Sequence, residues 1–366
     1  MSATVAPFVP PFCPNACCRF HCGPVDSWHW VRNGCFRRLQ PPHRVQRFRC
    51  GTCGRHFSEQ TFQASYWLKR PELYRAIFSD LVGCSGYRQI ARKYDLSPQT
   101  VALHAARLGR HCLLFHRRLC PQGPVREPLV LDSFQSFEYS QYHPTLFHLV
   151  VGKDSHFIYG FTDSELRRSG RMTARQKRRR AALEHAHGRP DPRSVQHEVA
   201  RVLGIVAPSP QRLVLHTDEH HDYPRALREL AHLEIEHHTT SSRAARTSRN
   251  DLFALNLVDL LIRHSGANHK RETIAFSKRR QGAAARLWAF LVWRNYGKWF
   301  SERKRGETPA TRAGVCPGRW SVREILSQRL FPGRIALPER WRLYYWGLTP
   351  TRRIPNARAH RLKYAA

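Results

Sequence analysis

Residues 128–133 read PLVLDS, and residues 212–220 read RLVLHTDEH. Each stretch is a short apolar run of strand-forming residues that leads to an aspartate, Asp132 in the first and Asp218 in the second. Runs of this length and composition are typical of buried strands, and we expect both strands to end at these aspartates. A carboxylate next to a buried strand costs free energy unless it is paired or bound to a cation.

The segments around these two stretches predict the order of the sheet. From residue 129 onward, three strand-like runs joined by short polar links predict an antiparallel meander. The expected elements are strands at 129–132, 146–151 and 156–161, a basic segment at 171–187, a helix at 194–206, a strand at 213–218, a helix at 223–232 and a strand at 233–236. This is the order of an RNase H-like fold, in which the first and fourth strands are neighbours. Asp132 and Asp218 are therefore expected to converge.

Converging carboxylates predict a cation site. Two carboxylates held close together repel each other and resist ionisation unless cations lie between them. Mg²⁺ prefers such oxygen ligands together with waters and a phosphate. A third acid is expected from the helix after the last strand, residues 251–264, whose sequence DLFALNLVDLLIRH is apolar nearly all round. Its exceptions, Asn256, Asp259 and Arg263, form one polar stripe.

The third acid has two candidates. Asp259 is preferred because a charge on a buried helix is costly unless it is paired or bound to metal. An ion pair with Arg263 is the competing explanation for Asp259. Glu272, in the stretch NHKRET, is the second candidate, but the cations around it favour a salt bridge equally well. For Asp132 and Asp218 themselves, the alternative is that they cap loops at strand ends.

The first sixty residues contain a predicted metal site. Seven of the eleven cysteines lie between Cys13 and Cys53, and two pairs have the spacing of a zinc ribbon: Cys13 with Cys18, and Cys50 with Cys53. Cys17 is an alternative to Cys18. The glycines of the second pair's loop permit a positive-φ turn. Four thiolates leave no open coordination position, so the zinc would be structural. Reduced, buried cysteines are the alternative.

The charge of the chain predicts a polyanionic partner. The 366 residues carry 61 Lys and Arg against 27 Asp and Glu, a net charge of +34. Such a balance is typical of nucleic-acid-binding proteins. A membrane surface is the alternative, but no segment reaches the ~18–20 apolar residues of a membrane-spanning helix. The first residues do not resemble a signal peptide, so we expect a cytoplasmic protein with reduced thiols.

Residues 85–111, SGYRQIARKYDLSPQTVALHAARLGRH, predict two helices joined by a turn. Ser97 can cap the second helix, with Pro98 at its first position, and this helix is expected to run to about Gly109. In a helix-turn-helix, the second helix enters the major groove of DNA. Paired helices also occur in proteins that never touch DNA, but the net charge favours DNA here. The residues expected to face DNA are Gln99, Thr100, His104 and Arg107.

Two basic clusters are also expected to contact DNA phosphates, one in the basic segment after the third strand and one after the helix at 251–264. A solvated charged face is the alternative for each cluster. The aromatic-rich stretch 287–300 is expected to pack in the core or in a dimer. The basic residues assigned to DNA are Arg175, Arg178, Arg179, Lys270, Arg271, Lys278, Arg279 and Arg280.

Composition divides the chain into four parts, which together predict a multidomain α+β protein. An RNase H-like α/β core with a mixed sheet follows two smaller amino-terminal units. The expected parts are a zinc ribbon at 1–60, a helix-turn-helix domain at 61–122, the core at 123–312 with a basic insert at about 165–192, and a basic aromatic carboxy-terminal tail at 313–366.

These features resemble those of bacterial insertion-sequence transposases of the DDE type. The resemblance rests on LVLDSF around Asp132, LHTDEH around Asp218, the polar stripe of the helix at 251–264, the cysteine pairs and the helix-turn-helix. That family's third acid is usually a glutamate in an Asn-x-x-Glu setting. The sequence departs from this pattern because Asn256 is followed three residues later by Asp259.

The resemblance implies a nuclease and strand transferase that uses two Mg²⁺ ions at Asp132, Asp218 and a third acid. It further implies double-stranded DNA as partner, both the terminal repeats of an element and the target. A homo-oligomer associated with the nucleoid is implied as well. A tyrosine nucleophile, such as Tyr139 or Tyr142, is a less favoured mechanism. A DNA-binding regulator with an inactive core is the alternative function, and the third acid separates the two.

Overall fold

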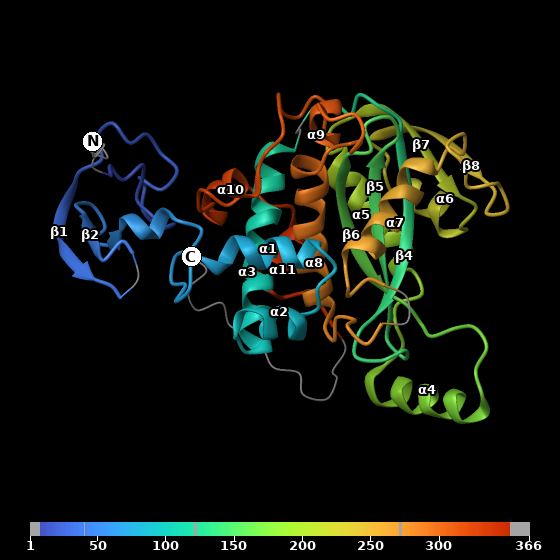
Figure 1. Ribbon diagram of the computed structural model, residues 1–366. Coiled ribbons are helices and arrows are strands. Elements are labelled where there is room, and N and C mark those ends of the chain that lie inside the picture. Colours follow the sequence, from blue (N-terminus) through green and yellow to red (C-terminus); the bar gives the residue numbers. More distant parts are fainter. Residues whose placement is uncertain (1–7, 40, 121–122, 271–272, 352–366) are drawn as a thin grey trace.

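The computed structural model describes residues 8–39, 41–120, 123–270 and 273–351. A small cysteine-rich sheet lies at one side, a group of helices lies in the middle, and a five-stranded sheet lies at the other side (Figure 1). None of the helices in these ranges is long and apolar enough to cross a membrane.

The cysteine-rich head is a three-stranded antiparallel sheet with its own small core. Its strands are β1 (Trp30–Arg37), β2 (Arg44–Cys50) and β3 (His56–Ser58), and the 3-10 helix η1 (Glu59–Phe62) follows. Phe48 is 1% exposed and stacks on Phe57, so aromatic side chains fill the space around the cysteines.

The two glycines of the second cysteine loop have different roles. Gly54 takes a φ of +70°, as the sequence predicts. Gly51 is not among the positive-φ residues, so the expectation is wrong there. A Cβ on Gly51 would lie 2.9 Å from His29 Cδ2, so the position needs a glycine because of space.

Three helices follow the head: α1 (Leu73–Val82), α2 (Tyr87–Tyr94) and α3 (Pro98–Leu119). Ser97 caps α3 as predicted, and its side-chain oxygen accepts a hydrogen bond from Thr100 N at 3.1 Å. The helix does not end near Gly109 but continues for ten more residues, because that half packs along a second buried helix. At the closest approach a Cβ on Gly109 would lie 2.5 Å from the Ala285 carbonyl oxygen.

The five-stranded sheet has the predicted order. Strands β4 (Leu129–Phe137), β5 (Pro144–Gly152) and β6 (Ile158–Glu165) form an antiparallel meander. β7 (Gln211–Asp218) pairs in parallel with β4, and β8 (Leu233–Thr240) pairs in parallel with β7. The spatial order is β6-β5-β4-β7-β8, so the first and fourth strands are neighbours as expected.

Helices cover both faces of this sheet. Ser133 of β4, His148 of β5 and Thr162 of β6 are opposite one another and mark one face. On this face the Thr162 hydroxyl donates a hydrogen bond to the Glu198 carbonyl of α5 (Ser194–Val206). α6 (Asp222–Leu227) packs on α5 at the same face. Leu149 and Phe161 point to the other face. There the ring centroid of Phe161 lies 4.6 Å from that of Trp288 in α8 (Arg280–Val292). α7 (Phe253–Ser265) packs on β4 and β5.

The carboxy-terminal region is not the tail that the sequence predicts. Trp341 is 1% exposed, and its indole N–H donates to the Phe161 carbonyl at 3.0 Å. Weak periodicity hid this packing because the segment is a series of short elements. They are α10 (Val322–Ile325), the 3-10 helix η3 (Pro332–Arg334) and α11 (Glu339–Trp346). The π-helix η2 (Trp293–Gly297) and α9 (Pro309–Arg312) come before this segment.

One hydrophobic core runs from Ala64 to Tyr345, and the head forms a second, separate core. The helices of 61–122 therefore share their core with the sheet, and the expected boundary near residue 122 is not a break in packing. α4 (Ala174–His187) has no buried residue and projects away from the sheet (Figure 1).

Candidate active site

The pairing between β4 and β7 places the two aspartates at matching positions. The last paired residues are Val130 and His216, and Asp132 and Asp218 each lie two residues further along their strands. Residues matched in a parallel pair point to the same face, and neighbouring strands lie about 4.8 Å apart. The sequence predicts that β4 ends at Asp132, and this is wrong. β4 continues to Phe137 because β5 pairs with it along its whole length.

The environment of Asp132 disfavours its charge. Burial, together with the nearby charges of Asp218 and Asp259, raises the pKa of this carboxyl to about 6. The backbone N–H of Ser133 opposes this by donating to Asp132 Oδ1 at 2.6 Å. Arg246 also lowers the pKa. The charges of Asp218 and Asp259 are therefore near enough to act on Asp132.

Asp218 and Asp259 are held in different ways. Asp218 lies at the end of β7, and its Oδ1 accepts from the backbone N–H of His220 at 3.0 Å. Asp259 lies on α7 and pairs with Arg263, with 3.0 Å between Oδ2 and Nε. This is the ion pair that the sequence offers as the competing explanation. The other oxygen, Asp259 Oδ1, is buried and has no hydrogen-bond partner among the described residues.

Of the two candidates for the third acid, the structure describes Asp259, whose charge acts on Asp132. The second candidate, Glu272, lies outside the described residues, as does Arg271. A buried aspartate whose ionisation is disfavoured, near two further carboxylates of which one has an unpartnered buried oxygen, fits a divalent cation. The set is not compact, since within the described ranges only a cysteine cluster has all its ligand atoms within 4.8 Å of one another.

A hydrogen-bonded group behind Asp132 was not found from the sequence. Ser133 Oγ lies 2.6 Å from His148 Nδ1 and 3.3 Å from the hydroxyl of Tyr223. His148 Nε2 lies 2.8 Å from Ser164 Oγ. The only local signal was the polar residues inside apolar strands. Their partners come from three other elements, so no spacing rule identifies them.

The four predicted zinc ligands lie together in the head. The sulfurs of Cys13 and Cys53 are 3.6 Å apart, and those of Cys18 and Cys50 are 4.0 Å apart. A tetrahedral site with Zn–S bonds of 2.3 Å needs sulfur separations of about 3.8 Å, so the cluster fits a zinc ion. Cys18 belongs to the cluster, whereas Cys17 is exposed and outside it.

The thiols of this cluster differ in acidity. Burial alone would raise the pKa of Cys50, but the backbone N–H of Cys53 and the indole N–H of Trp28, 3.3 Å from the sulfur, lower it to about 6. Burial raises the pKa of Cys13. A thiolate stabilised by N–H donors is already prepared for a metal.

The predicted DNA-facing side of α3 is only partly at the surface. Gln99 is exposed and Thr100 is half-buried. His104 is 7% exposed, so its assignment as an outward residue is wrong. Its ring lies against Tyr74 of α1, because α1 covers this side of α3. Arg107 donates to the Ala64 carbonyl at 3.1 Å and is likewise engaged within the protein.

The basic clusters divide in the same way. Arg175, Arg178 and Arg179 of α4 are exposed, as are Lys270 and Lys278, while Arg279 is half-buried. The assignment of Arg280 to DNA is wrong. Its side chain is 4% exposed and lies 3.1 Å from Asp163 Oδ2 and 3.2 Å from Glu165 Oε1, because it begins α8 beneath the sheet.

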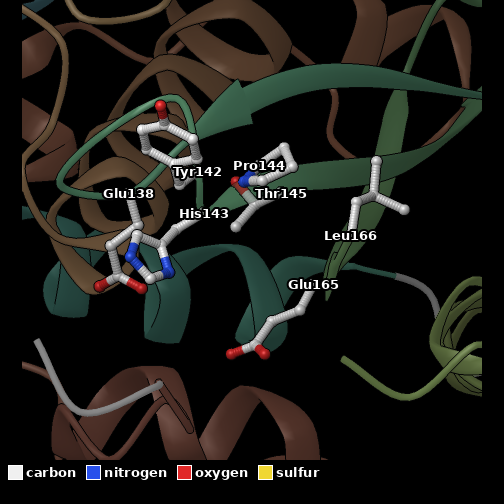
Figure 2. Close-up of a pocket in the computed structure, with 7 residues that line it drawn as sticks. All are labelled: Glu138, Tyr142, His143, Pro144, Thr145, Glu165 and Leu166. Atoms are coloured by element: carbon white, nitrogen blue, oxygen red, sulfur yellow. The ribbon is translucent and has the colours of Figure 1, made fainter. Parts of the chain in front are cut away.

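A small cavity lies elsewhere, where β4, β5 and β6 meet the turn at 138–144 (Figure 2). None of the three aspartates lines it. Glu138 and Glu165 do, but Glu138 accepts from the backbone N–H of Arg280 and Glu165 pairs with its guanidinium. These carboxylates are already compensated, so this cavity is not a second acidic site.

The comparisons with known proteins do not name a family. No protein-family model matches the chain, and no curated protein matches it in sequence. Among solved structures, it is similar to a chain in the cryo-EM structure of the simian T-cell lymphotropic virus intasome in complex with PP2A regulatory subunit B56 gamma. The identity is 15% and the TM-score 0.22, and the match covers 61% of this chain and 62% of that one. A likeness of this size defines neither activity nor substrate.

Proposed function

We propose that this chain is a metal-dependent DNA transposase. It would cleave phosphodiester bonds at the ends of a mobile element and transfer the freed 3′-hydroxyl into target DNA. The observation that carries the proposal is the β4–β7 register, which gives Asp132 and Asp218 matching positions on neighbouring strands. The order of strands supports an RNase H-like core, and the net charge of +34 supports DNA as the substrate.

Asp132, Asp218 and a third acid would hold two Mg²⁺ ions. When bound, such ions supply an activated water and stabilise the leaving 3′-oxygen. The chain's own groups set the geometry: the N–H groups of Ser133 and His220 each fix one carboxylate oxygen. Arg246, on an exposed loop, adds positive charge beside Asp132 where an anionic phosphate would lie.

The experiment is Mg²⁺-dependent strand cleavage of duplex DNA spanning the ends of the element, with purified full-length protein. We expect no product from Asp132→Asn or Asp218→Asn. Asp259→Asn and Glu272→Gln identify the third acid, since the variant that keeps wild-type cleavage is not a ligand. Asp154→Asn, an exposed acid in the turn between β5 and β6, is the matched control and should cleave normally.

We propose one structural zinc at Cys13, Cys18, Cys50 and Cys53, supported by sulfur separations of 3.6 and 4.0 Å. DNA would be contacted by the exposed basic residues rather than by the buried ones. For the described part of the chain these are the outer face of α4, Lys270 and Lys278, with Gln99 at the start of α3.

One observation favours a second function, a DNA-binding regulator with an inactive core. The Asp259–Arg263 ion pair, at 3.0 Å, occupies one oxygen of the third acid that the structure describes. A regulator would bind element-end DNA and give no cleavage with Mg²⁺ or Mn²⁺, even with both Asp259 and Glu272 intact. Cleavage by the wild-type protein excludes this alternative.

A further inference from the structure

Tyr223 lies beside the strand aspartates but comes from another element. It is the second residue of α6, which begins four residues after Asp218, and it is 2% exposed. Its hydroxyl is 3.3 Å from Ser133 Oγ, and the backbone N–H of Ser133 donates to Asp132 Oδ1 at 2.6 Å. The β4–β7 pairing ends at Val130 and His216, so a side chain from α6 can reach Ser133 on β4 beyond this pairing.

A chain of hydrogen bonds fixes this hydroxyl from behind. Ser133 Oγ contacts His148 Nδ1 at 2.6 Å, and His148 Nε2 contacts Ser164 Oγ at 2.8 Å, so the chain crosses β4, β5 and β6. His148 is completely buried, and burial lowers its pKa to about 3. Its ring is therefore neutral, with one nitrogen donating and the other accepting. The tautomer of His148 therefore decides which atoms donate and which accept in this series of hydrogen bonds.

We propose that Tyr223 is a positioning residue: its hydroxyl, together with His148 and Ser164, holds Ser133, whose N–H orients the carboxylate of Asp132 toward Asp218 and Asp259. This inference rests on the proposed function, because it concerns the same acidic site. A phenol donates one hydrogen bond and stays uncharged at neutral pH. It can therefore hold Ser133, and through the Ser133 N–H one carboxylate oxygen of Asp132, without adding a charge that competes for the cation.

The alternative is that Tyr223 only fills space between α6 and β4. The two roles differ in what the hydroxyl does, because Tyr223→Phe keeps the ring and removes one oxygen. Partners that orient metal-binding side chains change metal affinity by about 10–100-fold when they are lost. A space-filling ring would leave metal affinity unchanged on loss of the hydroxyl.

The test measures Mn²⁺ binding to full-length protein by titration without DNA, followed by cleavage as a function of Mg²⁺ concentration. For Tyr223→Phe we expect the Mn²⁺ dissociation constant to rise about 10-fold or more. Cleavage should return toward the wild-type rate at high Mg²⁺. Ser133→Ala, which breaks the chain at its centre, should shift binding in the same direction. Tyr94→Phe, at a half-buried tyrosine of α2, is the control for loss of a phenol oxygen.

Tyr223→Phe and Ser133→Ala proteins that bind Mn²⁺ as tightly as wild type overturn the inference, whatever their thermal stability. The proposed function fails in a different way. If Asp132→Asn binds Mn²⁺ as tightly as wild type, the aspartates are not the cation site. Weakened binding in Asp132→Asn together with unchanged binding in Tyr223→Phe overturns only the role of the tyrosine.

Discussion

The proposed site requires the carboxylate of Asp132, but burying its charge costs folding free energy. Burial and the charges of Asp218 and Asp259 raise its pKa to about 6. The folded protein therefore binds the proton on this carboxyl more tightly than the unfolded chain does, because the unfolded value is near 4. The resulting stabilisation is complete below about pH 4 and is lost as the pH rises through about 6. At pH 7 the ionised side chain opposes folding unless a cation is bound.

We therefore expect Asp132→Asn to raise the free energy of unfolding of the metal-free protein at pH 7 by about 1–3 kcal/mol. The gain should vanish below about pH 4, where the aspartate is already neutral. Mg²⁺ should stabilise the wild type but not the variant. Denaturant unfolding at both pH values measures this, with Asp154→Asn as control. A variant less stable than wild type at pH 7 contradicts the raised pKa.

At the level of residues, the sequence singles out the three aspartates of the proposed site but not their surroundings. Asp132, Asp218 and Asp259 stand out because a charge beside an apolar run is unusual wherever it occurs. Ser133 and Tyr223 were missed because their contacts join elements that are far apart in sequence. His104 and Arg280 were assigned to DNA wrongly, since a polar residue type does not reveal that another helix covers it.

α4 is the element most clearly exposed for a polyanion. A capping box joins Thr173 and Gln176, and the Glu184 carboxylate contacts Arg167, Arg180 and Arg189 at 2.9–3.5 Å. These contacts hold the inner side of the helix, while the outer side carries free basic residues. A helix with no buried residue gains little from packing, so its charge is its main property.

Replacing Arg175, Arg178 and Arg179 together by Gln should weaken DNA binding mainly at low salt. Each lost phosphate contact reduces the magnitude of the slope of log affinity against log salt by about 0.9. The slope of the triple variant should therefore be smaller in magnitude by about 2–3. Fluorescence anisotropy over a salt series measures it. The matched control is Gln at Arg303, Lys304 and Arg305, an equally charged exposed loop before α9. Equal slopes for both triple variants would show that α4 has no special role.

The elements of the core were predictable to different degrees. α5 has the bounds 194–206 that its sequence predicts, and the strand order follows from the positions of the apolar runs. α3 is longer than expected because its second half is buried against α8. A helix stabilised by such packing can contain residues that would end a helix at the surface. Gly109 is the clearest case, a helix breaker by propensity that allows close packing here.

The whole molecule consists of a large core and a separately packed head. The head touches the rest through Phe12, whose ring lies 5.2 Å from that of Phe331, and through Cys22, whose sulfur is 3.1 Å from the Gly333 carbonyl. The carboxy-terminal segment joins the two, because Arg340 of α11 is bound to Asp163 at 2.9 Å inside the large core. Composition could not reveal this role, since arginine and tryptophan there looked like a surface tail.

Because the head's own core is small, we expect its fold to depend on metal. Purified protein should contain about one zinc per chain, and Cys50→Ser should lower this content. Removing zinc with a chelator should expose residues 8–60 to protease while the large core keeps its thermal unfolding midpoint. Metal analysis and limited proteolysis measure these effects. A full zinc content in Cys50→Ser, or a head that resists protease after chelation, would contradict the site.

The central claim is that Asp132 and Asp218 act together on one cation-dependent reaction. Strand cleavage of element-end DNA by Asp218→Asn, measured beside wild type and Asp154→Asn, tests it most directly. Loss of product in the first variant, with DNA binding retained and the control fully active, is the predicted result. Wild-type cleavage by Asp218→Asn would contradict it.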